Sequence, residues 1–231
     1  MHMKTQKGFT LLEVLISIAV GVIVLAAIYA AVNLTQKSTA GTERKIYAQQ
    51  DARAALELMS LEIEMASFNP RPDLAGANFW VSPASCSPSP NQNYRGIQAA
   101  TPFSITVEMN LNGSAAVGDN PNEVITYTYD PTNQYIIRSL DCGSGANPFL
   151  GDIVGNPRSV RVINTNNVPV FRYFNAQGTE ITSAQLPASI PDIARIDITL
   201  WVETEDIDPA SGTRKKLFYS TSVIPRNHVI K

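Results

Sequence analysis

Glu13 is the only charged side chain between Phe9 and Leu34, and it interrupts an otherwise apolar run. As an α-helix this run spans about 39 Å, enough to cross the ~30 Å hydrocarbon core of a bilayer with some tilt. An ionisable carboxylate is costly in that position, so Glu13 marks a candidate functional site that needs a partner. Because the run contains no Lys or Arg, we expect that partner to lie outside the helix of Glu13.

The other residue types that carry chemistry are scattered. The histidines, His2 and His228, lie at opposite ends, no Ser or Cys has a recognisable His-containing partner set, and zinc-type Cys/His spacing is absent. The acidic cluster Glu203–Asp208 contains Asp206 and Asp208, which could offer oxygen ligands to calcium, but without the spacing of an EF-hand loop. A solvated hairpin end is the commoner origin of such a cluster. We therefore predict no enzymatic activity, no metal site, no cofactor and no small-molecule substrate.

The composition allows one membrane helix and one domain of ordinary size. The chain has 231 residues, of which 44% are hydrophobic, and its formal net charge of −2 makes nucleic acid an improbable partner. If the domain is exported, Cys86 and Cys142 are candidates for a disulfide. Closing that loop would stabilise the fold by roughly 4 kcal/mol in the chain-entropy description. Two free, buried cysteines are the alternative.

The N-terminal segment resembles the prepilin signal of type IV pilins and type II secretion pseudopilins. The resemblance is carried by a short basic head, the Gly8-Phe9 step, Glu13 and the uninterrupted apolar run after it. It implies that a prepilin peptidase cuts after Gly8 and that the new N-terminal residue, Phe9, is N-methylated. It also implies that Glu13 meets the N-terminal amine of a neighbouring subunit during assembly. A glycine suits the cut, since a side chain would obstruct close approach to the backbone.

Two other interpretations of the segment compete with this one. A secretory signal peptide would find small residues for its cleavage site at Ala26, Ala27, Ala30 and Ala31. The apolar region of a signal peptide is usually about 7–15 residues long, however, and this run is longer and contains Glu13. A plain membrane anchor explains the length, but it gives no reason for Glu13 or for the Gly8-Phe9 step.

We expect one long helix with two halves. The leader, residues 1–8, stays cytoplasmic by the positive-inside tendency, residues 9–34 cross the membrane, and residues 35–68 continue as an amphipathic half. A stripe at helical spacing is expected to pack on a sheet: Tyr47, Ala54, Leu58, Leu61, Met65 and Phe68. Asp51 falls on this stripe. The prolines after Asn69 end the helix, because proline cannot continue its hydrogen-bond ladder.

The remainder, residues 69–231, reads as a β-rich domain, which makes the fold class α+β with an antiparallel sheet. Residues 69–101 are predicted as a long, proline-rich loop. Strands are expected at Ser104–Met109, Glu123–Tyr129, Gln134–Leu140, Ser159–Ile163, Val168–Phe174, Ile193–Glu203 and Lys216–Ile224. Glu123–Tyr129 and Gln134–Leu140 should form one hairpin, and Ile193–Glu203 and Lys216–Ile224 should form another.

A narrower resemblance extends over the whole chain. Residues 53–66, the segment Pro169–Phe174, the strand Ile193–Glu203 and the segment Val223–Asn227 follow each other as in PilW-type minor pilins and, next, J-type pseudopilins. The resemblance implies a single-pass protein of the bacterial inner membrane whose domain is periplasmic, and which joins other pilins in an extracellular filament. It implies a low-copy subunit near the tip of a type IV pilus or of a type II secretion filament. The alternative to an assembly subunit is a binding or adhesion module exposed at the filament tip, with its binding site in residues 69–101.

Overall fold

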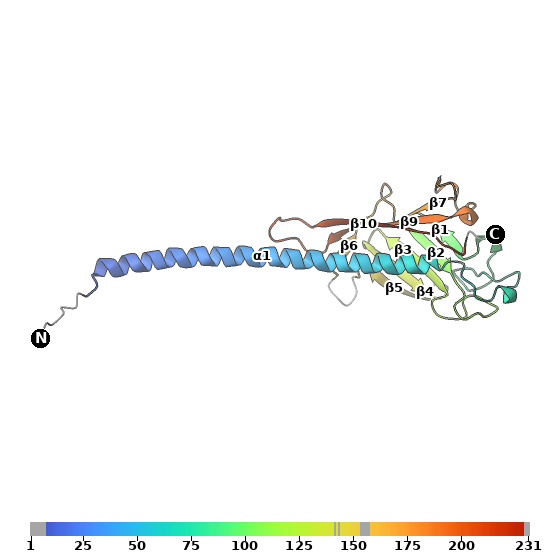
Figure 1. Cartoon of the computed structure of the whole chain (residues 1–231), viewed down its shortest axis with the longest axis horizontal. Coiled ribbons are helices and arrows are strands. Elements are labelled where there is room, and N and C mark those ends of the chain that lie inside the picture. The colour runs from blue at the N-terminus through green and yellow to red at the C-terminus, as the bar shows by residue number, and fades with distance from the viewer. Residues whose placement is uncertain (1–7, 141, 143, 153–157, 229–231) are drawn as a thin grey trace.

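The longest element of the protein is a single helix, α1 (Leu11–Glu64), which is uninterrupted for 54 residues. The computed structural model describes residues 8–140, 142, 144–152 and 158–228, so the predicted leader up to Lys7 lies outside the described residues. The N-terminal half of α1 projects away from the rest of the chain (Figure 1), and every side chain from Gly8 to Val32 is exposed. By length and composition this helix could cross a membrane, since its most apolar window has a mean hydropathy of 2.8.

Both ends of α1 are set by local contacts, and both differ from the prediction. The helix begins at Leu11 rather than at Phe9, because Thr10 has extended backbone angles and caps it. It ends at Glu64, before the prolines that were expected to stop it. Ser67 has a positive φ of 66°, and its N–H donates to the backbone carbonyl of Glu108 at 2.9 Å. This turn diverts the chain from the helix into the sheet.

The domain contains two antiparallel sheets where the sequence indicated one. The first has the order β1-β2-β3-β4-β5 and uses five consecutive segments of the chain. Its strands are β1 (Ile97–Ala100), β2 (Ser104–Glu108), β3 (Val124–Asp130), β4 (Tyr135–Leu140) and β5 (Ser144–Leu150). The pairing of β3 with β4 confirms the first predicted hairpin. β1 and β5 were not predicted, and β1 lies inside the segment expected to be a loop.

The second sheet is built around its longest strand. Its order is β10-β9-β7-β8, and β6 also pairs with β9. The strands are β6 (Val160–Val162), β7 (Phe171–Phe174), β8 (Glu180–Ile181), β9 (Arg195–Thr204) and β10 (Lys216–Val223), and three short 3-10 turns lie at η1 (Pro72–Leu74), η2 (Gln92–Tyr94) and η3 (Ile190–Asp192). The second predicted hairpin is confirmed, because β9 and β10 pair along eight residues from Lys216 opposite Glu203. With one helix and two antiparallel sheets, the α+β fold class is also confirmed.

The helix packs on the sheets through a different face from the predicted one. Its buried side chains are Ala48, Ala52, Ala55, Met59 and Ile63, and together with Ala66 just after its end they join side chains of both sheets in one core. The predicted stripe is exposed at Tyr47, Ala54, Leu58, Leu61 and Met65. The two faces are one residue apart, about 100° around the helix. Alanine lets the sheets approach closely, and this rotation keeps the Asp51 carboxylate at the surface, where it accepts a hydrogen bond from Ser159.

A half-buried ion pair fastens the same helix to the first sheet. Nη2 of Arg138 on β4 lies 2.5 Å from Oε1 of Glu62 on α1, and the Tyr127 hydroxyl on β3 donates to the other carboxylate oxygen. Burial and the neighbouring Glu62 carboxylate raise the pKa of Tyr127. The charged groups are thus paired across three elements, which fixes the rotation of α1 on the domain.

Candidate functional site

The segment that the sequence singles out lies at the free end of the projecting helix. Gly8, Phe9 and Thr10 are outside the helix, and a Cβ added to Gly8 would meet no atom within 4 Å. Phe9 is 88% exposed. The bond between Gly8 and Phe9 is therefore in an open, non-helical segment, and neither the helix nor the domain blocks it.

Glu13 and Thr10 form a reciprocal cap at the start of α1. The Thr10 hydroxyl oxygen accepts from the Glu13 N–H at 3.2 Å, and Oε2 of Glu13 accepts from the Thr10 N–H at 2.8 Å and from its hydroxyl at 3.0 Å. This is a capping box, which satisfies two backbone donors that would otherwise lack partners. The carboxylate also lies at the positive end of the helix dipole.

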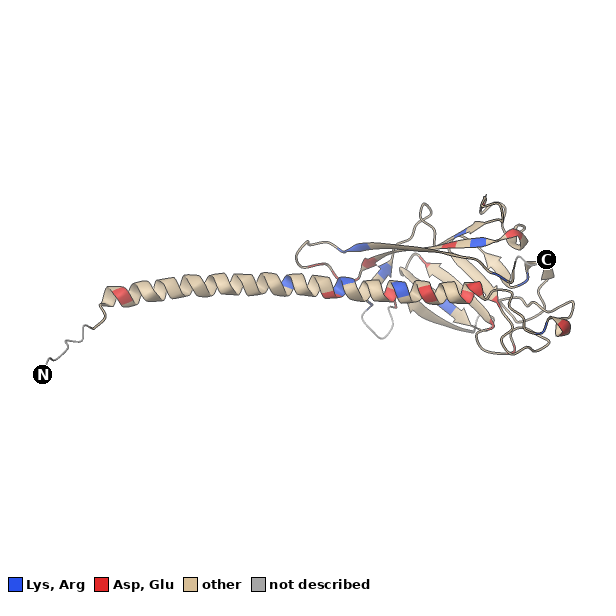
Figure 2. Cartoon of the chain, in the orientation of Figure 1, with Lys and Arg blue, Asp and Glu red and all other residues tan. Residues whose placement is uncertain are grey.

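A cationic partner from outside the helix remains a prediction for Glu13, but the carboxylate is not without contacts. It has a neutral partner in Thr10, and the signal was present in the sequence as Thr10-x-x-Glu13. It has no cationic partner there, because the next charged residue along the helix is Lys37, as the colouring in Figure 2 shows. The carboxylate is held in place by the cap, and its charge remains uncompensated.

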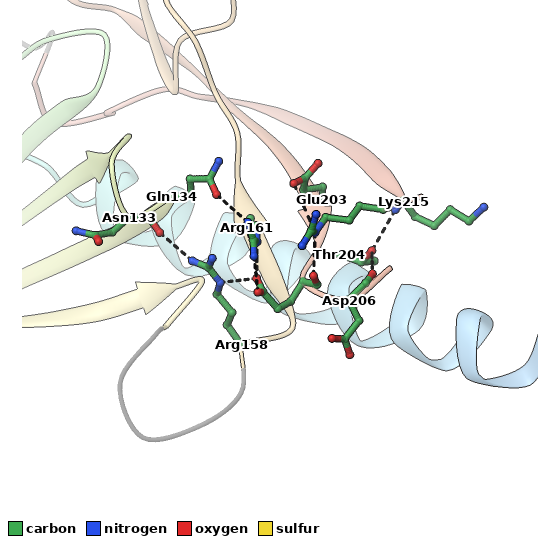
Figure 3. A network of polar contacts seen from close by, with 10 residues as sticks. Asn133, Gln134, Arg158, Arg161, Glu203, Thr204, Asp206 and Lys215 are labelled. Atoms are coloured by element: carbon green, nitrogen blue, oxygen red, sulfur yellow. Dashed lines mark hydrogen bonds and ion pairs between the residues drawn. The ribbon is translucent and has the colours of Figure 1, made fainter. Parts of the chain in front are cut away.

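Most of the carboxylates in the acidic cluster Glu203–Asp208 are paired with cations, and Figure 3 shows the part of this network around Arg158 and Arg161. The Glu205 carboxylate lies 2.5 Å from Nε of Arg158 and 2.6 Å from Nε of Arg161. Hydrogen bonds from Arg161 and Arg158 lower the pKa of Glu205 to about 2. The sequence did not indicate these partners, because more than forty residues separate them from Glu205.

The two residues considered as calcium ligands are separately engaged. Oδ2 of Asp206 lies 3.3 Å from Nε of Arg44, and Oδ2 of Asp208 lies 2.9 Å from Nζ of Lys215. Hydrogen bonds from Lys215, the Ala210 N–H and Ser211 lower the pKa of Asp208 to about 2. Within the described residues, no three His, Cys, Asp or Glu side chains are grouped to hold a metal ion.

The structure brings His228 and Ser67 together, which no pattern in the sequence had indicated. Nε2 of His228 is 2.9 Å from the carbonyl oxygen of Ile190, and Nδ1 is 3.0 Å from Oγ of Ser67. Since a carbonyl can only accept, Nε2 donates and Nδ1 accepts from the hydroxyl. Ser67 Oγ in turn accepts from the Gly96 N–H. The imidazole thus ties the helix end, β1, η3 and the C-terminal segment together.

Protonation of His228 should weaken the domain in acid. Burial lowers the pKa of His228 below its ordinary value of 6.5, and the charge of Arg95 adds to this. Between pH 6.5 and the lower pKa of the folded state, the unfolded chain binds more protons than the native state. The free energy of unfolding therefore decreases as the pH falls through this interval, by at most about 1.4 kcal/mol per pH unit. Urea unfolding of the full chain in detergent, at a series of pH values, measures the slope.

The variant His228→Gln isolates this effect. Glu108 has the opposite effect on stability. Burial raises the pKa of Glu108 to about 8, so above pH 4.5 the native state keeps a proton that the unfolded chain has lost. The contribution of Glu108 to stability therefore falls as the pH rises above 4.5. Glu108 is common to both proteins, so the difference between their slopes reports on His228. Identical slopes would contradict the prediction.

The two cysteines join the first sheet to the segment before it. Cys86 and Cys142 form a disulfide with a Cα–Cα distance of 5.3 Å. The bond lies beside a small cluster of Phe79, Val81, Val117 and Val124, separate from the main core. The loop of residues 69–101 is therefore held at this point, and also where the Val81 N–H donates to the buried Glu108 carboxyl at 3.1 Å.

Comparison with known proteins gives one match. A family model described as the prokaryotic N-terminal methylation motif matches residues 3–29. The motif is consistent with the prepilin-peptidase signal of type IV pilins and pseudopilins, and it supports processing by that peptidase and assembly with other pilins. No curated protein and no solved structure matches the chain.

Proposed function

We propose that this chain is a minor, low-copy subunit of a type IV pilus, which starts or caps filament assembly at or near the tip. One observation carries the proposal: a methylation motif at residues 3–29 leads directly into a helix whose first half is exposed and has Glu13 as its only charge. An exposed apolar helix of this length is stable only when lipid or other helices cover it.

The rest of the helix supports the same reading. The exposed stripe at Tyr47, Ala54, Leu58, Leu61 and Met65 adds apolar surface beyond the span, on a flank of α1 about 100° from the face that packs on the domain. A neighbouring subunit could pack along both parts. The domain carries two sheets and a long tethered loop, which fits a subunit present in few copies at a filament end.

In the proposed pathway, the chain spans the inner membrane with its domain in the periplasm, is cut after Gly8 and is methylated at Phe9. The flanking cations do not decide the orientation by themselves, since Lys37, Arg44 and Lys45 follow the span as Lys4 and Lys7 precede it. Protease protection in spheroplasts tests the orientation: the domain should be digested from the periplasmic side.

Substituting Gly8 tests the processing step. Gly8→Leu should leave the precursor uncut, because a branched side chain obstructs the close approach of a peptidase to the backbone. Gel mobility and the mass of the N-terminal peptide separate precursor from product. Gly21→Leu is the matched control, since Gly21 lies in the exposed half of α1, away from the cut, with nothing within 4 Å of its Cβ position. Complete cutting of the Gly8→Leu chain would count against the signal.

The runner-up is a J-type pseudopilin of a type II secretion filament, and the partners distinguish the two. Cross-linking in cells should capture pilus subunits if the first proposal is right, and secretion pseudopilins if the second is. In either case the chain would act through other pilin-like subunits.

One observation favours a binding module at the tip as a further candidate. An open pocket of about 580 Å³ lies under the loop of residues 69–101, with Phe79, Trp80, Gln92 and Arg95 in its lining. Affinity of the intact protein for a surface or ligand, lost in Trp80→Ala, would support this role. Binding only to other subunits would favour the assembly role.

A further inference from the structure

We propose that the tip of the β9–β10 hairpin docks on the anionic headgroups of the membrane that α1 spans, and so fixes the orientation of the domain before assembly. The inference rests on the proposed membrane insertion and adds a contact surface to it. The hairpin tip, residues 205–215, runs back along α1 toward the N-terminus (Figure 1).

The tip is seated on the helix close to the membrane span. A Cβ at Gly41 would fall 2.5 Å from Oδ1 of Asp208, so a larger residue there would displace the Asp208 carboxylate from the helix. Nη1 of Arg44 donates to the Ile207 carbonyl at 2.8 Å. Seven residues of helix separate Gly41 from Leu34, which is about 10 Å at 1.5 Å per residue.

That distance places the Gly41 contact at the outer surface of the lipid headgroups. The headgroup layer extends about 5–8 Å beyond the hydrocarbon core on each side. The exposed side chains of the tip include the uncharged Ile207, Pro209 and Ala210, and the exposed Asp206 carboxylate beside them is paired with Arg44. A tip at this height can rest on the outer surface of the headgroups while its carboxylates stay in their ion pairs.

The charges around the tip complement an anionic surface. Residues 35–45 and 205–216 together hold six cationic and four acidic side chains, whereas the whole chain has a net charge of −2. Three of the acidic groups, those of Glu205, Asp206 and Asp208, are occupied in ion pairs. Three cations have no ion-pair partner in the described part of the chain: Lys37, Lys45 and Lys216.

The tip is also rigid enough to transmit its position to the domain. Asp208 accepts from the Ala210 N–H at 3.0 Å and from the Ser211 hydroxyl at 2.8 Å, and its carbonyl accepts from the Gly212 N–H at 2.8 Å. The hairpin continues without a break into β9, the central strand of the second sheet. A contact at the tip therefore constrains the whole domain.

Fluorescence quenching on the full chain in vesicles tests the proposal. A fluorophore is attached at Ala210→Cys, and nitroxide-headgroup lipid is added to phosphatidylcholine vesicles with and without phosphatidylglycerol. The comparison label is Gln177→Cys, in the turn after β7 at the far end of the domain (Figure 1). Strong quenching at residue 210, weak quenching at 177, and a dependence on phosphatidylglycerol and low salt are expected.

Replacing the three lysines that have no ion-pair partner measures how much each charge contributes to docking. Lys37→Gln, the change nearest the span, should lower the docking equilibrium about fivefold, Lys45→Gln and Lys216→Gln should lower it by less, and Arg226→Gln at the opposite end should not change it. Equal quenching at both labels would overturn the proposal. Quenching that depends on the density of protein in the vesicles, and not on anionic lipid, would also overturn it and would indicate contact between two copies of the chain. Vesicle flotation distinguishes the failures: a chain that does not float refutes membrane insertion itself.

Discussion

Glu13→Ala is expected to be cut after Gly8 normally and to enter filaments about tenfold less efficiently or worse. The carboxylate has no cationic partner in its own helix, and a lone charge in lipid is costly, so the amine of a neighbouring Phe9 is the partner that would offset it. The measurement is the amount of variant recovered in sheared filaments, relative to the amount in the membrane.

Because Glu13 also closes the capping box, two matched variants are needed. Glu13→Gln keeps an acceptor for the Thr10 N–H but removes the charge, and it should fail as alanine does. Thr10→Val removes the cap but keeps the charge, costing about 1 kcal/mol at the helix start, and it should still assemble. If the glutamine variant assembles normally, the role of Glu13 is capping and the proposed pair is refuted.

Removing the disulfide with Cys86→Ser and Cys142→Ser together should lower the free energy of unfolding by about 4 kcal/mol, since the bond closes a long loop in the unfolded chain. The separation of 56 residues spans β1 to β4, so most of the first sheet lies inside the loop. Urea unfolding of the full chain in detergent provides the measurement.

Reduction of the unmodified protein is the control for this prediction. A reductant should bring its unfolding midpoint to that of the double-serine variant and leave the variant unchanged. An unmodified protein that is insensitive to reductant, together with a variant of equal stability, would mean that the bond contributes nothing.

The sequence was informative where a pattern is local. Alternation along β9 and β10 identified both strands and their pairing, and the Gly8-Phe9 step with Glu13 identified the segment that the methylation motif matches. Thr10 could also have been found, because its role follows from a spacing of three residues.

Long-range contacts were not accessible in the same way. The helix face was misassigned because large side chains were given more weight than alanines, although Asp51 within the stripe already argued against it. The partners of Glu205 and the Ser67–His228 contact join segments far apart in sequence. Single residues with no periodicity, such as Gly41, reveal their role only once the opposing chain is in place.

The exposed state of α1 up to Val32 also has a thermodynamic consequence. No side chain of that half belongs to the core, and the first buried helix residue is Gly41. Anchoring and folding are therefore separable quantities: substitutions in the projecting half should change partition into membrane or filament and leave the unfolding free energy of the domain alone. Substitutions at Met59 or Ile63 should lower the unfolding free energy of the domain and leave the partition into membrane or filament unchanged. The two halves of one continuous helix are therefore under different selective constraints.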